Sequence, residues 1–276
     1  GIKNVTVDEH HFPGHFPESP IMPGVLQLAA IQQSAELLLR QAGKVRPQDD
    51  LRLVAIRRMK FRNPALPGDR LRISVKVHEE GKEFHVRGRV ETETTGKTVS
   101  QGDAVLEIAG ELPDRMGELF SPPLRFADEI SDETTEECAE ILKDVPHRYP
   151  FVLVDRQLRF DRENSRNLVL KNVSGADWFF GALRRQAVPE FLQAEIAAQS
   201  CCALAFELPE TRGKLAYFVS IDEASFRHEV VPGDQLVMES VGNVRGGKLG
   251  NATTSLYVGS LEVAQLSVKF VLVDRE

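Results

Sequence analysis

The stretch PGVLQLAAIQQS at residues 23–34 has a second version in the same chain, PEFLQAEIAAQS at residues 189–200. In the first version, apolar residues surround the expected helix instead of forming one stripe, which predicts a buried helix over residues 24–41. The proline at its start suits the first turn of a helix. An internal repeat of this kind decides the architecture, because a chain built from two copies of one unit folds as two related units.

Two further pairs of segments flank the helices. KNVTVDEHHF (3–12) resembles KNVSGADWFF (171–180), and AIRRMKFRNPALPGDRL (55–71) resembles SIDEASFRHEVVPGDQL (220–236). The three pairs keep the same order and lie 168, 166 and 165 residues apart. A duplication explains this order. We expect a first repeat over residues 1–113, a linker over 114–135 and a second repeat over 136–276.

Each repeat reads as a strand, a loop, one long helix and four strands. Residues 70–77 alternate apolar and polar side chains, as an antiparallel sheet with one solvated face requires. The other strands are expected at 83–94, 97–109, 214–227, 234–244, 248–258 and 262–273. Residues 138–160 add a short helix and a strand without counterpart in the first repeat. The first strand of that repeat therefore either precedes this sequence or is replaced by part of the linker.

Composition excludes several classes of protein. The formal charge of −7 disfavours a nucleic-acid-binding protein, which usually carries a strong basic excess. The three cysteines, Cys138, Cys201 and Cys202, are odd in number and lack CxxC spacing, so no disulfide framework or zinc site is predicted. This cysteine usage favours a reducing cytoplasm. No uncharged apolar stretch of membrane-spanning length is present, so we expect no membrane insertion.

Four segments carry a family resemblance: ILKDVPHRYPFVLVDRQLRF, KNVTVDEHHFPGHFP, SPIMPGVLQL and SIDEASFRHEVVPGDQLVMES. They resemble the β-hydroxyacyl-acyl carrier protein dehydratases of fatty acid synthesis, whose fold is the hotdog. The resemblance covers both repeats and leaves out only the linker. It implies an α+β double hotdog, in which two antiparallel sheets each wrap a long central helix and pack as an intramolecular pseudo-dimer.

The resemblance also implies which residues act. In that family a histidine from the HFP loop of one subunit meets a carboxylate from the central helix of the other. The histidine position falls on His15 in the first repeat, whereas the acid position there is Ala29. In the second repeat the acid position is Glu195, and the loop FFGALRRQ (179–186) holds no histidine. We therefore expect one composite site per chain, as in the double-hotdog dehydratase domains of modular polyketide synthases.

Dehydration of a 3-hydroxyacyl thioester requires a base, an acid and a group that holds charge on the thioester oxygen. An imidazole near neutral pKa suits the base, here His15. A carboxyl kept protonated by an apolar wall suits the acid, so we expect burial to raise the pKa of Glu195. The backbone amide of Gly24, at the start of a helix, suits the oxyanion. The rest of the expected substrate site is Phe16, Pro23 and Gln199. No metal and no organic cofactor is expected.

The expected partner is an acyl carrier protein that presents the substrate on phosphopantetheine. A basic surface would suit this acidic partner. The candidate docking residues are Arg57, Arg58, Lys60, Arg62, Arg184 and Arg185. The alternative interpretation of the basic run at 57–62 is a solvated strand face. Further pairing of pseudo-dimers into a larger homo-oligomer is also open.

Two other functions remain open at this stage. A hotdog acyl thioesterase would use the helix acid with a water, although such thioesterases do not need the HFP loop. A catalytically silent partner that binds acyl carrier protein is the other alternative. Glu18 supports it, because Glu18 stands where the family usually has glycine after HFP, and so does the missing first strand.

Overall fold

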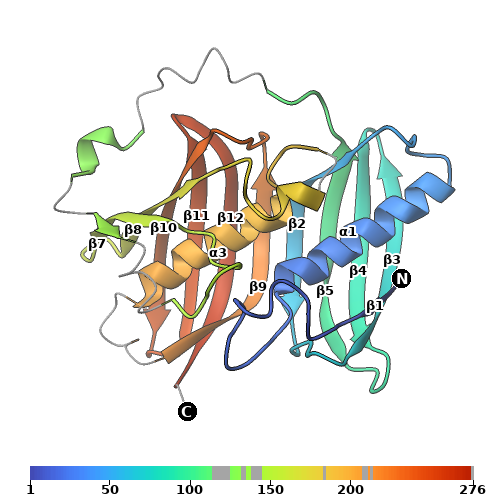
Figure 1. The fold of residues 1–276 in the computed structure, drawn as a ribbon, viewed down its shortest axis with the longest axis horizontal. Coiled ribbons are helices and arrows are strands. Elements are labelled where there is room, and N and C mark those ends of the chain that lie inside the picture. The colour runs from blue at the N-terminus through green and yellow to red at the C-terminus, as the bar shows by residue number, and fades with distance from the viewer. Residues whose placement is uncertain are drawn as a thin grey trace.

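The computed structural model describes residues 1–113, 125–131, 135–137, 145–182, 185–206, 211 and 214–274. Among these, two long helices, α1 (Gly24–Gln41) and α3 (Glu190–Phe206), lie on one face of a broad sheet (Figure 1). The first repeat contributes β1 (Ile2–Asn4), β2 (Leu51–Phe61), β3 (Arg70–Glu80), β4 (Glu83–Thr92) and β5 (Thr98–Ile108). The second contributes β6 (Glu136–Glu137), β7 (Arg156–Asp161), β8 (Arg166–Asn172), β9 (Lys214–Phe226), β10 (Gln235–Arg245), β11 (Leu249–Val258) and β12 (Leu261–Asp274). Two short 3-10 helices are η1 (Ala127–Glu129) and η3 (Phe180–Ala182).

The two expected sheets are joined into one. The 12 strands follow the order β1-β3-β4-β5-β2-β9-β12-β11-β10-β8-β7-β6, and every pairing is antiparallel. The junction is β2 against β9, where Ala55 pairs with Ser225 and Lys60 with Ser220. Residues 55 and 60 of the first repeat correspond to residues 220 and 225 of the second, which lie 165 positions later. The repeat relation therefore converts each of these pairs into the other. The pseudo-twofold axis of the duplicated chain therefore passes through the β2–β9 ladder.

The two central helices differ in burial. Helix α3 is buried almost all round, with only Phe191 partly exposed. The prediction that α1 is also buried all round is wrong, because Leu37 and Leu38 are 62% and 43% exposed. In the second repeat the segment before β7 packs against α3, where Leu153 N–H bonds to Gln199. The described first repeat has no such segment, so one side of α1 stays open to solvent.

The described part of the linker packs on the outer side of the second repeat. Phe126 is buried against Tyr257 and the neighbouring strand residues Leu158, Leu168 and Val237. β6 pairs with β7, whereas β1 forms the other edge of the sheet. The described linker residues therefore supply no substitute strand beside β1. Residues 114–124 and 132–134, with the expected short helix at 138–144, lie outside the described residues, and the three domain boundaries stay predictions. None of the described helices is long and apolar enough to cross a membrane.

A buried charge cluster closes one side of the seam between the repeats. Glu190, the first residue of α3, stands at the position that Gly24 holds in α1. Its carboxylate accepts a hydrogen bond from the Leu53 backbone N–H at 3.3 Å and lies 3.7 Å from the Arg52 guanidinium. Glu229 lies 3.8 Å from Arg52 and 2.8 Å from Arg185. Strand β2 of the first repeat is thus tied to α3 of the second by buried charges.

Burial raises the pKa of Glu190 to about 7, and the neighbouring Glu229 carboxylate adds to this effect. The ordinary value for this carboxyl is 4.5, so the folded state holds the proton more tightly than the unfolded state. The stability that comes from this group is fully present below about pH 4.5 and is lost as the pH rises to about 7. The loss is on the order of 3 kcal/mol.

The free energy of unfolding of Glu190→Gln should therefore rise relative to that of the wild-type protein as the pH increases from about 4.5 to 7. Above about pH 7 the difference between the two proteins should stay constant. Thermal unfolding midpoints across this range measure it. Glu163→Gln, in the exposed turn between β7 and β8, controls for the loss of one carboxylate. A difference between Glu190→Gln and wild type that shrinks with rising pH would show that the ionised form is the stabilised one.

Candidate functional site

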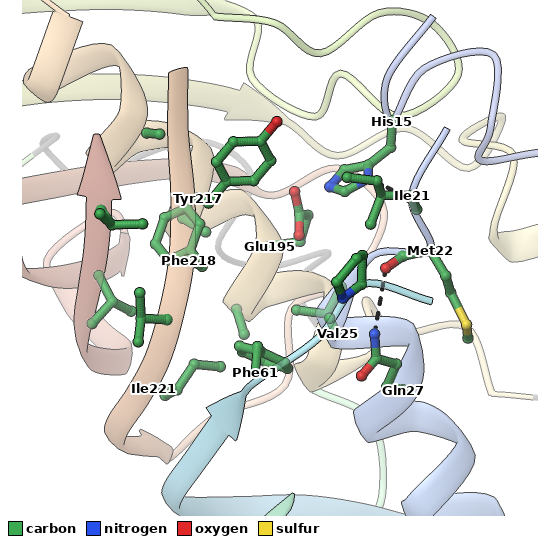
Figure 2. A pocket seen from close by; sticks show the side chains of 18 of the residues that line it. His15, Ile21, Met22, Val25, Gln27, Phe61, Glu195, Tyr217, Phe218 and Ile221 are labelled. Atoms are coloured by element: carbon green, nitrogen blue, oxygen red, sulfur yellow. Dashed lines mark hydrogen bonds between the residues drawn. The ribbon is translucent and has the colours of Figure 1, made fainter. Parts of the chain in front are cut away.

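A cavity of about 590 Å³ lies at the seam and is walled by both repeats. Most of its walls are apolar, which suits a hydrocarbon chain. The first repeat contributes His15, Phe16, Ile21, Met22, Gly24, Val25, Gln27, Phe61, Arg62, Asn63 and Pro64. The second repeat contributes His147, Ala194, Glu195, Ala198, Ala216, Tyr217, Phe218, Val219, Ile221, Val268 and Val271. Three ionisable groups of the cavity meet at one place, where His15 of one repeat faces Glu195 of the other beside His147 (Figure 2).

His15 is held in one orientation by its own loop. Its Nδ1 lies 2.7 Å from the carbonyl oxygen of Ile21. Since a carbonyl oxygen only accepts, Nδ1 carries the hydrogen, and Nε2 keeps its lone pair for the cavity. Burial lowers the pKa of His15 to about 4, and the charge of His147 adds to the effect. His15 is therefore neutral at pH 7 and able to accept a proton.

The loop that carries His15 packs against the second repeat. Arg148 N–H donates to the Gly14 carbonyl oxygen at 3.0 Å. A side chain at Gly14 would bring its Cβ to 2.1 Å from the Arg148 carbonyl oxygen, so only glycine fits this contact. The contact places His15 beside the next loop of the second repeat, with ring centroids of His15 and His147 5.4 Å apart.

Glu195 projects from α3 and is only 6% exposed. Gln199, one turn later, donates to Glu195 Oε1 at 2.9 Å. His147 Nε2 lies 3.4 Å from the same oxygen. The expectation of a raised pKa for Glu195 is wrong in direction. Burial alone would raise it, but the hydrogen bond and charge of His147, the His15 ring and the Gln199 amide together lower the pKa of Glu195 below its ordinary value.

Sequence reasoning missed His147. In the sequence it stands in PHRYP, inside one of the segments that carry the family resemblance, and it was not among the expected site residues. In the structure it is 4% exposed, contacts Glu195 and meets the Phe16 ring edge-on at a centroid distance of 5.0 Å. The signal available was the position of PHRYP inside a family motif. What the sequence lacked was any pattern that links residue 147 to residue 195 in space.

The other expected substrate residues fall into two groups. Gly24 and Phe16 line the cavity, whereas Pro23 and Gln199 do not. A Cβ at Gly24 would come within 2.6 Å of the Phe61 ring, so glycine is needed there. Gln199 is fully buried and acts behind Glu195, accepting from Leu153 N–H and donating to the Phe151 carbonyl. It is a support for the carboxylate and does not contact the cavity.

The candidate docking residues do not form one surface. Arg185 is directed inward to Glu229, and Arg184 lies outside the described residues. Arg57 pairs with Glu223 across the seam. Arg62 lines the cavity. Arg58 and Lys60 line a second hollow, together with Arg87 and Arg89 of β4 and Asp103 of β5.

The chain matches the family model for the FabA-like domain over residues 1–103 and 145–267. It is 41% identical over 136 residues to the 3-hydroxyacyl-(acyl-carrier-protein) dehydratase FabZ of Pelotomaculum thermopropionicum, a match that covers 96% of that protein and 48% of this chain. It is 35% identical over 145 residues to the protein of the same name from Macrococcus caseolyticus, covering 99% of that protein and 52% of this chain. Each relative thus corresponds to about half of this chain.

Solved structures resemble the whole chain. The dehydratase domain of RzxB from Pseudomonas fluorescens superposes with a TM-score of 0.62 at 12% identity, over 98% of this chain and 92% of that domain. A putative oleoyl thioesterase from Lactobacillus plantarum gives 0.63 at 9% identity, over 100% and 96%. These likenesses confirm the predicted double hotdog but do not choose between activities. The family model and the FabZ relatives identify the family. The chain belongs to the FabA-like domain family and carries two hotdog repeats on one polypeptide.

Proposed function

We propose that the protein dehydrates a 3-hydroxyacyl thioester on acyl carrier protein to the trans-2-enoyl thioester, at one composite site per chain. The observation that supports it most is the meeting of His15 and Glu195 from different repeats in one apolar cavity (Figure 2). One nitrogen of His15, one of His147 and a carboxylate oxygen of Glu195 all lie within 4.8 Å of one another. The relatives named FabZ share this activity by name.

His15 is the base of the proposed reaction. Its Nε2 lone pair is directed into the cavity because Nδ1–H is held by Ile21. A neutral imidazole with a low pKa is a weak base, but it is never blocked by a proton at neutral pH. It takes the proton from C2 of the substrate as the C3–oxygen bond breaks and the C2=C3 double bond forms. A positioned proton-transfer group of this kind contributes about 10² to 10⁴ in rate.

The acid of the proposed reaction is the pair of Glu195 and His147. A carboxyl whose pKa is lowered is ionised in the free protein and carries no proton to give. The proton for the departing hydroxyl is therefore the one that His15 takes from C2, which Glu195 Oε1 accepts from the His15 ring, within 4.8 Å, while His147 Nε2 holds the carboxylate at 3.4 Å. It passes to the hydroxyl, and water leaves. Gln199 keeps the carboxylate oriented during the transfer.

Gly24 holds the thioester oxygen in this proposal. It opens α1, where the first backbone N–H groups have no partner within the helix, and it lines the cavity. The positive end of the helix dipole favours the negative charge that builds on that oxygen. One such donor is worth roughly 3 to 4 kcal/mol of transition-state stabilisation.

A basic surface on the first repeat supports docking of an acidic carrier protein. Lys60 on β2 lines the second hollow with Arg58, Arg87 and Arg89, and Arg62, which follows β2, lines the cavity. Asp103 neutralises part of this charge through Arg58 and Arg87, at 3.1 Å and 2.9 Å. The surface stays net positive in a chain whose formal charge is −7. An acidic partner is attracted there and repelled elsewhere.

A single assay separates dehydration from the alternatives. The protein is mixed with a 3-hydroxyacyl thioester, and both the enoyl absorbance and the release of free thiol are followed. Enoyl product supports the dehydratase, whereas free thiol without enoyl product indicates the thioesterase. Neither product, with carrier binding intact, indicates the silent partner and refutes the proposed activity.

His15→Ala and Glu195→Gln should each lower kcat for enoyl formation by about 10² to 10⁴, because each removes one positioned proton-transfer group. Stopped-time assays of enoyl product measure this. His10→Ala, an exposed histidine in the same loop, should keep full activity. Full activity in either site variant would show that the reaction takes place elsewhere.

His147→Gln should shift the acid side of the pH profile of kcat/KM to higher pH. The charge of His147 helps to lower the pKa of both His15 and Glu195, so its loss raises both values. A base with a higher pKa becomes blocked by a proton at a higher pH. His11→Gln, a second buried histidine, is the matched control. A lower rate without movement of the profile would limit His147 to a packing role.

The double variant Arg58→Glu/Lys60→Glu should raise KM for the carrier-bound substrate roughly tenfold or more, because it replaces attraction of the acidic carrier with repulsion. Its KM for a pantetheine thioester, which lacks the carrier protein, should stay unchanged. Lys76→Glu with Lys82→Glu, exposed on and after β3, makes the same charge change away from the cavity. Steady-state kinetics with both substrates provide the comparison. Equal effects on both substrates would refute docking at this surface.

A further inference from the structure

Three of the polar side chains that line the cavity have the composition of a metal site. We propose that His15, His147 and Glu195 bind a divalent transition ion such as Zn²⁺, and that the bound ion reversibly blocks the protein. The binding stands on the geometry of the cavity alone. The block rests on the proposed function, because it requires that these groups carry out the reaction.

The spacing is close to that of a zinc site. The three candidate ligand atoms all lie within 4.8 Å of one another, and the His147–Glu195 edge measures 3.4 Å. With bonds of about 2.1 Å, a tetrahedral zinc ion holds its ligands roughly 3.4 Å apart. One edge therefore already has the required length. The His15 ligand atom lies up to 4.8 Å from the other two and must approach them by up to about 1.4 Å, so its ring and the loop that holds it move together.

The surroundings of the ligands also suit a metal. A histidine that binds a metal usually donates its other ring N–H to a carbonyl or carboxylate, which fixes the ring. His15 already does so, through Nδ1 and the Ile21 carbonyl. The Glu195 carboxylate is likewise held by Gln199. On His147, Nδ1 is buried without a hydrogen-bond partner among the described residues, and Nε2 already faces the Glu195 carboxylate.

The donor set and the open position select the kind of ion. The cavity leaves room for a water as fourth ligand. Two imidazoles, one carboxylate and one open position favour Zn²⁺ or Co²⁺ over Mg²⁺ and Ca²⁺, which prefer oxygen ligands.

The cysteines of the described chain do not offer a competing site. Cys201 and Cys202 are buried in α3, and burial raises the pKa of Cys201 to about 11. They are therefore thiols at neutral pH, and a thiol is a poor metal ligand. Another histidine, His85, is exposed beside Glu80 and Glu83, at 3.5 Å and 3.2 Å. It provides the control that the experiment needs.

The experiment titrates Co²⁺ into the full chain, washed with chelator and free of any affinity tag, and records the visible d–d absorption. We expect a band typical of nitrogen and oxygen ligands without thiolate charge transfer, displaced by one equivalent of Zn²⁺. His15→Ala, His147→Ala and Glu195→Gln should each weaken Co²⁺ binding roughly tenfold or more. His85→Ala should leave the band unchanged. Circular dichroism shows whether each variant is folded.

A band that survives in all three folded cavity variants, or that disappears in His85→Ala, would overturn the inference. So would the absence of a band at millimolar Co²⁺. The activity arm is separate. Zn²⁺ should inhibit enoyl formation, and excess chelator should restore it. If the protein binds Co²⁺ but shows no dehydratase activity, the proposed function is wrong and the metal site stands. If it shows dehydratase activity but does not bind Co²⁺, the metal site is wrong and the proposed function stands.

Discussion

The antiparallel ladder between β2 and β9 is the contact on which the site depends. It fuses two repeats that would otherwise be separate units, and it fixes their relative position through pairs such as Ile56 with Ala224. Because register on a pleated sheet moves in whole residues, a slip of one residue would turn every side chain of β9 to the other face. Ile221, which is buried and lines the cavity, would then turn away from it. The loop that carries His15 and the helix that carries Glu195 meet only in the observed register.

The electrostatics of the cavity follow from its burial. A lone carboxylate on a helix as apolar as α3 would hold its proton, but Glu195 is surrounded by two imidazoles and an amide that favour its ionised form. Burial lowers the pKa of His15, and His147 adds to this effect, so His15 stays neutral at pH 7 although Glu195 acts in the opposite direction. The chemistry of the site therefore belongs to the group of side chains and cannot be divided among single residues.

The sequence predicted the fold well because the repeat, the helix pattern and the strand alternation are local signals. The same signals could not reveal that two sheets become one, since the β2–β9 pairing joins segments about 165 residues apart. The family motifs led to His15, Gly24 and Glu195, which the structure brings to one cavity. They gave no hint of the contact between His147 and Glu195, and the pKa of Glu195 came out in the wrong direction for that reason. The sequence predicted the burial of Glu195 but not its contact with His147.

The two repeats differ at the start of their central helices. In the first repeat the helix starts with Gly24, whose missing side chain leaves room for the Phe61 ring. In the second, the equivalent start is Glu190, and its carboxylate fills the corresponding space together with Arg52. A buried carboxylate at a helix start cannot coexist with an oxyanion there, because two negative charges would share one dipole. Glu190 instead contacts β2 of the first repeat through Leu53 N–H and Arg52, so the position that opens onto the cavity in one repeat joins the two repeats in the other.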